Sequence, residues 1–412
     1  MDPATIGAAA VIFTAVIMGL VAMILGARSQ LVAQGDVSVF INGNPDLTVK
    51  VAPGQSLLSA LGSQKVFIPS ACGGGGTCAQ CKCIVLDGGG DVLPTELPNL
   101  SLAERKQNVR LSCQVKVKQD LKLKLPEEIF GVKKFTCKVI SNDNVATFIK
   151  ELKLQLPEPM DCRPGDYIQI DVPRYELDYN QLKDNIADEY KGDWDRFNVW
   201  DAKAFNREDG IYRAYSMANY PAEGDIAMFN IRIASPPPRG PKGLPGGVCS
   251  SWVFSLKAGD EVTVGGPFGE FHLNEGTGRP MIYIGGGAGM APLRSHIFHM
   301  FRVLQTGREI HYWYGARSPK EVFYWDEFKA LEAEFPNFKC FLALSNAEPE
   351  DNWTGLTGFI HQVLFDEYLK DHEAPEDIEY YICGPPLMFK AVRGMLDNLG
   401  VPEEMVRFDD FG

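Results

Sequence analysis

Four cysteines have the spacing that an iron–sulfur centre needs. Cys72, Cys78 and Cys81 lie in one glycine-rich loop, with five residues in the first gap and two in the second. A fourth thiolate could come from Cys113, on a later segment. Four thiolates around two bridged irons make a [2Fe–2S] cluster, and glycines let backbone N–H groups approach its sulfides. The loop therefore predicts a [2Fe–2S] cluster as the metal centre of the chain.

Other interpretations of the cysteines carry less weight. Zinc sites usually pair two short knuckles, whereas Cys113 stands alone between Ser112 and Gln114. Disulfides are not expected, because ten cysteines without a secretory spacing indicate a reducing compartment. Cys83 falls on the opposite face of a strand expected at residues 82–86, so we assign it a structural role.

Length and composition indicate several folded domains. The chain has 412 residues, of which 45% are hydrophobic and 11% aromatic, which excludes a disordered protein. Its formal net charge of -13 argues against nucleic acid as a partner, because phosphate binding requires basic patches.

An uncharged apolar segment precedes these domains. No charged residue lies between Asp2 and Arg28, and residues 5–26 are rich in Ile, Val, Met, Leu and Ala. About 20 apolar residues can cross a bilayer, so this segment is predicted to be a single transmembrane helix. A cleaved signal peptide would need a positively charged start and a small-residue cleavage site, and a buried helix is the other alternative. Arg28 on the C-terminal side predicts that the bulk of the chain is cytoplasmic.

Residues 36–129 are predicted to form a β-grasp module around the cysteine loop. Short β-prone runs alternate with turn residues, and two short helical patterns lie between them. The expected strands are 37–41, 47–51, 82–86, 109–117 and 121–125, and the expected helices are 56–61 and 102–106.

Residues 130–274 contain many β-prone runs and few helical patterns, which predicts a β-barrel. Arg213, Tyr215 and Ser216 would offer a pyrophosphate clamp, a flat face and a hydrogen-bond donor near a ring nitrogen. Taken alone, they would also fit an ordinary strand. Residues 175–210 form a polar and aromatic insertion to which the sequence assigns no role.

A second group in the barrel segment opens a helix expected near Trp252. Gly247, Ser250 and Ser251 would offer donors to the same pyrophosphate. Either group is a weak signal alone. The two groups together in one barrel segment, followed in the chain by a nucleotide-binding domain, indicate FAD.

Residues 275–412 alternate between apolar strands and amphipathic helices, the pattern of a doubly wound parallel sheet. The strands are expected at 281–284, 310–314, 340–344 and 380–383, and the helices at 293–303, 325–331, 359–369 and 387–399.

A glycine-rich turn after the first strand of this sheet predicts a dinucleotide site. The pyrophosphate would lie where the turn meets the N-terminus of the next helix. At the end of the last strand, Cys383 and Gly384 lie at the carboxyl edge of the sheet, where ligands bind in such folds, although a buried small residue would also fit there. The residues of the turn are Gly285, Gly286, Gly287, Gly289 and Pro292.

These motifs resemble known families. The run Arg213 to Ser216, the turn Gly285 to Pro292 and the run Cys383 to Pro385 together resemble the ferredoxin–NADP reductase superfamily. The cysteine module is similar to [2Fe–2S] ferredoxins with a five-residue first gap. With the apolar segment in front and the ending at residues 408–412, the full length is similar to the family of F subunits of the bacterial sodium-pumping NADH:quinone oxidoreductases.

The superfamily resemblance implies roles for single residues. Arg213 would bind the FAD pyrophosphate, Tyr215 would pack on the flavin ring and Ser216 would hydrogen-bond near its N5. Cys383 would lie near the nicotinamide C4, and the terminal aromatic Phe411 would cover the other face of the flavin. The expected catalytic residues are Ser216, Cys383 and Phe411, and the residues expected to cap the FAD phosphates are Gly247, Ser250 and Ser251.

The resemblance also favours NADH over NADPH. Related NADPH enzymes carry a basic residue after the third strand of the nucleotide sheet. Here Ser345 is followed by Asn346, Ala347 and Glu348, and an acidic side chain there disfavours a second phosphate.

The resemblance to the F subunits implies an electron-input role. Electrons would pass from NADH through FAD to the [2Fe–2S] cluster, and on to integral membrane subunits of a quinone reductase in the bacterial inner membrane. Sodium transport would be carried out by those subunits, because one helix whose most polar side chains are threonines cannot form a path for an ion. Two alternatives remain open: the soluble reductase component of a bacterial multicomponent monooxygenase, and a membrane-anchored non-catalytic redox or nucleotide sensor.

Overall fold

The computed structural model describes residues 12–23, 35–70, 72–126, 129–130, 132–237, 241 and 243–409. The chain divides into two structural units. The first consists of residues 1–70 and 74–131, and the second of residues 71–73 and 132–412.

The predicted transmembrane segment is described only in part. Residues 12–23 are helical and exposed, and the rest of the span predicted at 5–26 lies outside the described residues. Among the residues that the structure describes, no helix has both the length and the apolar character needed to span a bilayer.

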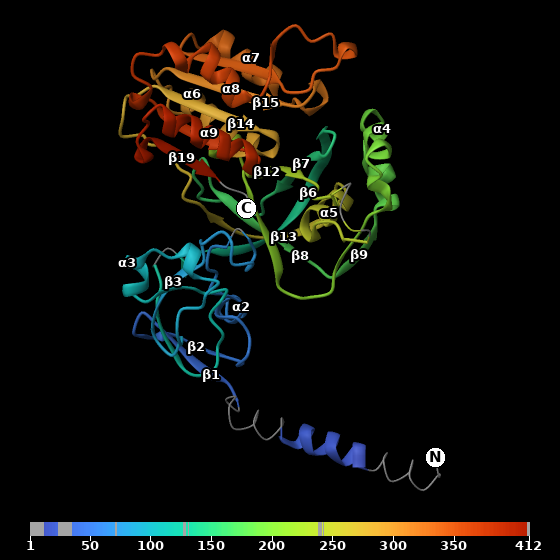
Figure 1. Cartoon of the computed structure of the whole chain (residues 1–412), viewed down its shortest axis with the longest axis vertical. Coiled ribbons are helices and arrows are strands. Elements are labelled where there is room, and N and C mark those ends of the chain that lie inside the picture. Colours follow the sequence, from blue (N-terminus) through green and yellow to red (C-terminus); the bar gives the residue numbers. More distant parts are fainter. Residues whose placement is uncertain are drawn as a thin grey trace. The chain divides into compact units, whose positions relative to one another are not determined.

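The first unit, of which Figure 1 labels β1, β2 and β3, contains a five-stranded sheet with the order β2-β1-β5-β3-β4. β1 pairs in parallel with β5, and the other neighbours are antiparallel. Helix α2 begins after Ser56, whose side chain accepts a hydrogen bond from the Ser59 N–H, and it buries Leu57, Leu58 and Leu61 against the sheet. This is the predicted β-grasp arrangement. Its elements are β1 (Val37–Ile41), β2 (Asn44–Val51), α2 (Leu57–Ser63), β3 (Lys82–Asp87), η1 (Leu97–Asn99), α3 (Leu102–Lys106), β4 (Val109–Leu111) and β5 (Leu121–Lys124).

Cys113 lies in a turn and not in the strand predicted at residues 109–117. β4 ends at Leu111, whose carbonyl accepts hydrogen bonds from the N–H groups of Gln114 (2.8 Å) and Val115 (3.1 Å). Leu111, Cys113, Val115 and Val117 are all buried, so the alternation of a strand persists in the sequence although the ladder has stopped.

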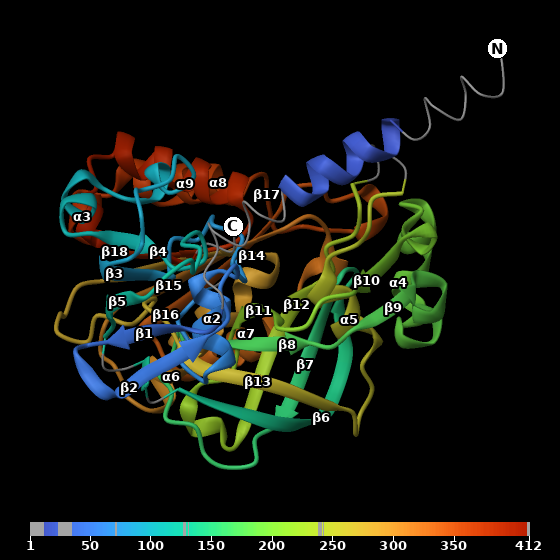
Figure 2. The ribbon, with the colours of Figure 1, turned by 90° about the horizontal axis from the view of Figure 1, so that it is seen from below.

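The second unit begins with a six-stranded barrel of order β11-β8-β13-β6-β7-β12, which can be followed in Figure 2. The barrel closes between the ends of β11 and β12, where the Ala218 N–H donates to the Met228 carbonyl at 2.7 Å. Its interior is filled mainly by aliphatic side chains of the strands, and β11 contributes the partly buried Ile211 and Tyr215. Its elements are β6 (Lys133–Ala146), β7 (Ile149–Gln155), β8 (Tyr167–Val172), β11 (Ile211–Ser216), η5 (Pro221–Glu223), β12 (Ile226–Arg232), α5 (Val248–Ser255) and β13 (Glu261–Phe268).

The insertion at residues 175–210 folds as a small layer on the barrel. Its two strands pair in antiparallel fashion, and the helices between them bury an aromatic core that includes Tyr179, Trp194 and Trp200. Phe254 of α5 joins this core, so the insertion is packed on the helix predicted to begin the phosphate site. Its elements are β9 (Tyr175–Asp178), η3 (Tyr179–Asn185), α4 (Asp188–Arg196), η4 (Val199–Asp201) and β10 (Lys203–Asn206).

The rest of the second unit is a parallel sheet of order β17-β16-β15-β14-β18-β19 with helices on both faces (Figure 1). Along β14, Met281 and Tyr283 pack in the cluster that includes α6 and α7, whereas Ile282 and Ile284 pack with α8 and α9. The doubly wound fold is therefore confirmed. Its elements are β14 (Met281–Gly286), η6 (Gly287–Gly289), α6 (Met290–Arg302), β15 (Ile310–Ala316), η7 (Pro319–Glu321), α7 (Trp325–Glu334), β16 (Phe338–Leu344), η8 (Pro349–Asp351), β17 (Leu356–Thr357), α8 (Ile360–Glu367), η9 (Leu369–Asp371), η10 (Pro375–Asp377), β18 (Glu379–Cys383), α9 (Pro386–Asn398), η11 (Glu403–Met405) and β19 (Val406–Asp409).

Candidate functional site

The cysteine loop depends on glycine conformations and on hydrogen bonds to its neighbours. Gly74 and Gly76 have φ angles of +91° and +81°, and a Cβ atom on Gly76 would lie 2.6 Å from Nε2 of Gln114. The Gly74 N–H donates to Oγ of Ser70 at 3.0 Å, and Nδ2 of Asn99 donates to the Gly76 carbonyl at 2.9 Å. These contacts fix the path of the loop without using its cysteine side chains.

Cys81 and Cys113 form a pair of buried thiols. The Ser112 N–H donates to the Cys81 carbonyl at 2.9 Å, and the two cysteines are 1% and 8% exposed. The hydrogen bond between the two thiols, together with burial, raises the pKa of Cys81 well above its ordinary value. A positive metal centre is what deprotonates such neighbouring thiols, so the pair fits iron ligation.

The other two predicted ligands, Cys72 and Cys78, are half-buried. Across the described ranges, no three His, Cys, Asp or Glu side chains gather as ligands of one ion. A [2Fe–2S] cluster divides its four thiolates between two irons and so does not require such a group of three.

A buried ion pair supports the turn that carries Cys113. Nη2 of Arg110 on β4 lies 2.6 Å from Oε2 of Glu96, and Nη1 donates to the carbonyls of Gly89 (3.0 Å) and Gly90 (2.8 Å). The pair therefore joins the segment before α3 to the end of β4. Cys83 lies on β3 opposite Arg110 of β4 and is also buried. This burial raises the pKa of the Cys83 thiol to about 12.

The three residues predicted to hold the flavin lie together on β11. Arg213 is opposite Ile170 and Tyr215 opposite Ile168 of β8, so these two side chains share one face of the sheet. Tyr215 is half-buried against the barrel core, and its hydroxyl contacts the thiol of Cys249 on α5. β11 and the first turn of α5 are thus neighbours, as a site that binds one pyrophosphate from two sides requires.

The serines predicted to cap the phosphates have protein partners. Oγ of Ser250 accepts the Ala234 N–H at 3.0 Å, and Oγ of Ser251 lies 2.6 Å from the Tyr179 hydroxyl. Gly247 is the N-cap of α5, and the Gly247 N–H donates to the Ala234 carbonyl at 2.7 Å. The free donors that this helix start can offer are therefore the N–H groups of its first turn.

The glycine turn of the parallel sheet packs directly on the end of β18. The turn residues Gly285 and Gly286 end β14, and Gly287 and Gly289 lie in η6 just before α6. A Cβ atom on Gly289 would lie 2.2 Å from the Cys383 carbonyl oxygen and 2.6 Å from the Gly384 nitrogen. The predicted pyrophosphate turn therefore contacts the backbone at Cys383, the residue predicted to lie near the nicotinamide. Pro292 is buried in the first turn of α6.

Ser216 meets the parallel sheet through an acidic residue that the sequence did not predict. Oγ of Ser216 donates to Oδ2 of Asp409 at 2.5 Å, across the junction of the barrel and the sheet. Asp409 ends β19 and is the register partner of Cys383 on β18. Asp409 therefore connects Ser216 to the strand beside Cys383, whose own side chain is 1% exposed and belongs to the core of the sheet. The only signal in the sequence was an acidic residue shortly before a terminal aromatic.

Of the two remaining predictions, one can be located. Phe411 lies outside the described residues. The segment after β16 folds back on β15, where the Ser345 N–H donates to the Ala316 carbonyl at 2.9 Å, and Nδ2 of Asn346 donates to Oε1 of Glu348 at 3.1 Å. An acidic side chain therefore lies near the carboxyl edge of the sheet.

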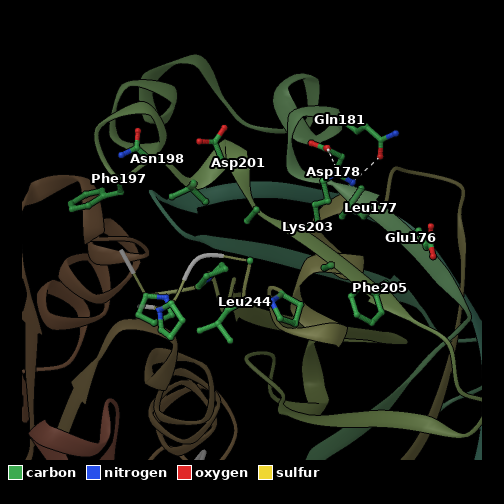
Figure 3. A pocket seen from close by; sticks show the side chains of 18 of the residues that line it. Glu176, Leu177, Asp178, Gln181, Phe197, Asn198, Asp201, Lys203, Phe205 and Leu244 are labelled. Atoms are coloured by element: carbon green, nitrogen blue, oxygen red, sulfur yellow. Dashed lines mark hydrogen bonds and ion pairs between the residues drawn. The ribbon is translucent and has the colours of Figure 1, made fainter. Parts of the chain in front are cut away.

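A cavity of about 1050 Å³ lies between the paired strands β9 and β10 and the proline-rich segment before α5 (Figure 3). Glu176, Asp178, Asp201 and Lys203 give it a charged wall, and Phe205 adds an aromatic side chain. The described residues that line it include none of those predicted to bind a cofactor.

Family comparisons place two modules along the chain. Residues 39–118 match a family described as 2Fe-2S iron-sulfur cluster binding domain. Residues 283–394 match a family described as oxidoreductase NAD-binding domain.

Curated relatives cover nearly the whole chain. The F subunit of the Na(+)-translocating NADH-quinone reductase of Pseudomonas paraeruginosa is 57% identical over 402 residues, which is 97% of both chains. The protein of the same name in Psychrobacter cryohalolentis is 54% identical over 415 residues and covers 100% of both.

Two solved structures have a similar fold over most of the chain. The Amycolatopsis cytochrome P450 reductase has a TM-score of 0.63 and 24% identity, and covers 91% of this chain and 98% of its own. A ferredoxin reductase in carbazole 1,9a-dioxygenase has a TM-score of 0.61 and 25% identity, and covers 92% of this chain and 98% of its own.

Proposed function

Because this chain belongs to the family of Na(+)-translocating NADH-quinone reductase F subunits, we propose that it takes electrons from NADH and passes them singly to other subunits of that quinone reductase. The observation that carries the proposal is the hydrogen bond from Ser216 of the barrel to Asp409, the register partner of Cys383 in the parallel sheet. A hydride donor bound on the sheet and an acceptor bound on the barrel would face each other at such a junction.

The barrel supplies the residues that would hold FAD. Arg213 would pair with its pyrophosphate, Tyr215 would lie against the flavin ring, and the first-turn N–H groups of α5, which follow the N-cap Gly247, would complete the anion site. Ser216 would present its hydroxyl to the ring. When bound, FAD accepts a hydride from NADH and releases the two electrons one at a time.

The parallel sheet would bind NADH at its carboxyl edge. Gly285, Gly286, Gly287 and Gly289 let the pyrophosphate approach the N-terminus of α6, and Gly384 keeps the facing turn open. Cys383 and Asp409 would flank the nicotinamide. Glu348, near the end of β16, would disfavour a 2′-phosphate and so select NADH.

The cysteine loop and the turn after β4 would carry the one-electron acceptor. Cys72, Cys78, Cys81 and Cys113 would supply the four thiolates of the [2Fe–2S] cluster, and the buried pair Cys81 and Cys113 supports this assignment.

Asp409→Asn is expected to lower the rate of FAD reduction at saturating NADH by about tenfold to 100-fold, because a fixed negative charge stabilises the positive charge that hydride loss leaves on the nicotinamide. Stopped-flow absorbance of the flavin measures this rate. The matched control is Asp409→Glu, which keeps the charge and should retain most of the rate. Equal rates for wild type and Asp409→Asn would remove Asp409 from the site.

We also propose that residues 5–26 insert in the bacterial inner membrane as one helix, with the rest of the chain in the cytoplasm. The motivation is the absence of charge between Asp2 and Arg28, and the quinone reductase in the name of the relatives, which implies other subunits as partners.

One experiment tests the anchoring and the electron input together. Full-length protein and a chain lacking residues 1–28 are mixed with phosphatidylethanolamine–phosphatidylglycerol vesicles and separated by flotation. Both proteins are expected to bleach their FAD with NADH, and only the full-length protein should float. A full-length protein that stays in the aqueous fraction would favour a soluble reductase. If neither protein reduced its flavin, the electron-input proposal would fail and a sensor would be the better interpretation.

The soluble oxygenase reductase has one observation in its favour, the 25% identical ferredoxin reductase with a TM-score of 0.61. The relatives that are 54% and 57% identical over nearly the full length outweigh it.

A further inference from the structure

A buried arginine joins the nucleotide sheet to the barrel. Arg294 lies on α6, the helix that starts at the glycine turn, and is 6% exposed. Nη1 donates to the Ala218 carbonyl at 3.0 Å, and Nη1 and Nη2 reach the two carboxylate oxygens of Glu223 at 3.0 and 2.9 Å. This is a bidentate, charge-assisted contact whose planar geometry fixes direction as well as distance.

The Arg294 guanidinium also binds α7, a helix of the same parallel-sheet domain as α6. Nε and Nη2 donate to Oε2 of Glu327 at 3.1 and 2.8 Å. Burial alone would lower the pKa of Arg294, but the bonds to Glu223 and Glu327 raise the pKa above its ordinary value. Arg294 is therefore charged whenever the two carboxylates are, and its orientation is fixed by two helices before it contacts the barrel.

A second residue of α6 also connects this helix to the barrel. Oγ of Ser295 donates to the Asn219 carbonyl at 2.8 Å. Asn219 is itself tied to β12, because its side chain donates to the Ile226 carbonyl at 2.9 Å and accepts the Met228 N–H at 2.8 Å. The segment that follows β11 is thus clamped between its own barrel and α6.

Tyr324, the N-cap of α7, adds a third connection. Its hydroxyl accepts a hydrogen bond from Nδ2 of Asn230 on β12 at 2.7 Å and donates to the carboxylate of Glu151 on β7. The Arg294 guanidinium lies 5.2 Å from the centre of the Tyr324 ring. All three connections therefore meet around Arg294.

Arg294 is close in the chain to the glycine turn, and its contact on the barrel is close in the chain to Ser216. The carbonyl that it holds belongs to Ala218, two residues after Ser216, and Arg294 lies five residues after Gly289. One side chain thus fixes the strand that would carry the flavin ring relative to the helix that would carry the NADH pyrophosphate. We propose that Arg294 is a positioning residue for hydride transfer, which sets the separation of the two rings without touching either of them. This inference rests on the proposed function.

A purely structural role predicts a different result, and a second buried pair provides the comparison. Nη2 of Arg308 lies 2.8 Å from Oε2 of Glu379, with side chains 8% and 3% exposed. Arg308 also donates to the carbonyls of Asn274 and Arg279, and all of these partners lie outside the barrel strands. Arg308→Met should therefore destabilise the fold much as Arg294→Met does, without changing how the sheet meets the barrel.

The experiment compares these two variants in the full-length protein with bound FAD. Arg294→Met is expected to keep stoichiometric FAD and an NADH dissociation constant within about threefold of wild type, while flavin reduction at saturating NADH slows about 100-fold, the cost of a misplacement near 1 Å. Arg308→Met should reduce its flavin within about twofold of the wild-type rate. Arg294→Lys keeps the charge but loses the bidentate geometry of the guanidinium, so it should recover only part of the flavin reduction rate.

The outcomes separate the inference from the function on which it rests. An Arg294→Met rate equal to that of Arg308→Met would overturn the positioning role. Wild-type protein that failed to reduce FAD with NADH would instead refute the proposed function. Should Arg294→Met lose FAD, Glu223→Gln, which weakens the same contact from the barrel side, decides the matter: at least about tenfold slower reduction with unchanged NADH affinity supports the role, and an unchanged rate overturns it.

Discussion

Cys113→Ala is expected to remove the [2Fe–2S] cluster while the FAD is still reduced by NADH at the wild-type rate. Cys113 is buried beside Cys81, and its turn is fixed by the hydrogen bonds of Ser112 and Gln114. Without this thiolate, one iron would keep only one of its two cysteine ligands. The turn carries no second cysteine that could replace Cys113. Iron and acid-labile sulfide analysis measures the cluster, and stopped-flow absorbance at the flavin band measures the reduction.

Cys83→Ala is the matched control for this prediction. Cys83 is as buried as Cys81 but lies on β3 opposite Arg110, so its removal should leave the cluster and its low-temperature EPR signal intact. If Cys113→Ala kept the signal and Cys83→Ala lost it, the fourth ligand would be Cys83. Loss of flavin reduction in Cys113→Ala would show that the two cofactor sites are not independent.

The sequence predicted the parts of the site that depend on local spacing. Cys72, Cys78 and Cys81 are close in the chain, and the glycines before α6 are recognisable because a strand precedes them and a helix follows. The prediction of a strand at Cys113 is wrong, because apolar residues continue at alternate positions of the sequence after β4 has ended at Leu111.

Contacts between distant segments could not be predicted in this way. Ser216 and Asp409 are 193 positions apart, and their contact depends on the register of β19 beside β18 and on the closure of the barrel. Arg294 appears in the sequence as one cation in an amphipathic helix, a pattern that usually marks an exposed face. Only the fold reveals that its partners Ala218 and Glu223 come from the barrel.

The second large effect is expected at the glycine turn. In Gly289→Ala, the added Cβ would lie 2.2 Å from the Cys383 carbonyl oxygen and 2.4 Å from its carbonyl carbon. These are backbone atoms, so α6 and the end of β18 would have to separate by about 1 Å before ordinary contact is restored. That movement would displace the helix N-terminus that is proposed to receive the pyrophosphate. Because both NADH affinity and ring placement would suffer, flavin reduction at a fixed NADH concentration should fall about 1000-fold.

Gly394→Ala provides the control within the same sheet domain. A Cβ there meets nothing within 4 Å, and Gly394 lies inside α9, where alanine favours the helix. Its NADH dissociation constant and flavin reduction rate should match those of wild type. Both variants should retain FAD and be reduced by dithionite, because the proposed FAD residues belong to the barrel. If Gly289→Ala bound NADH with wild-type affinity, the dinucleotide could not lie on the N-terminus of α6, and the assignment of the turn at Gly285 to Gly289 would have to be given up.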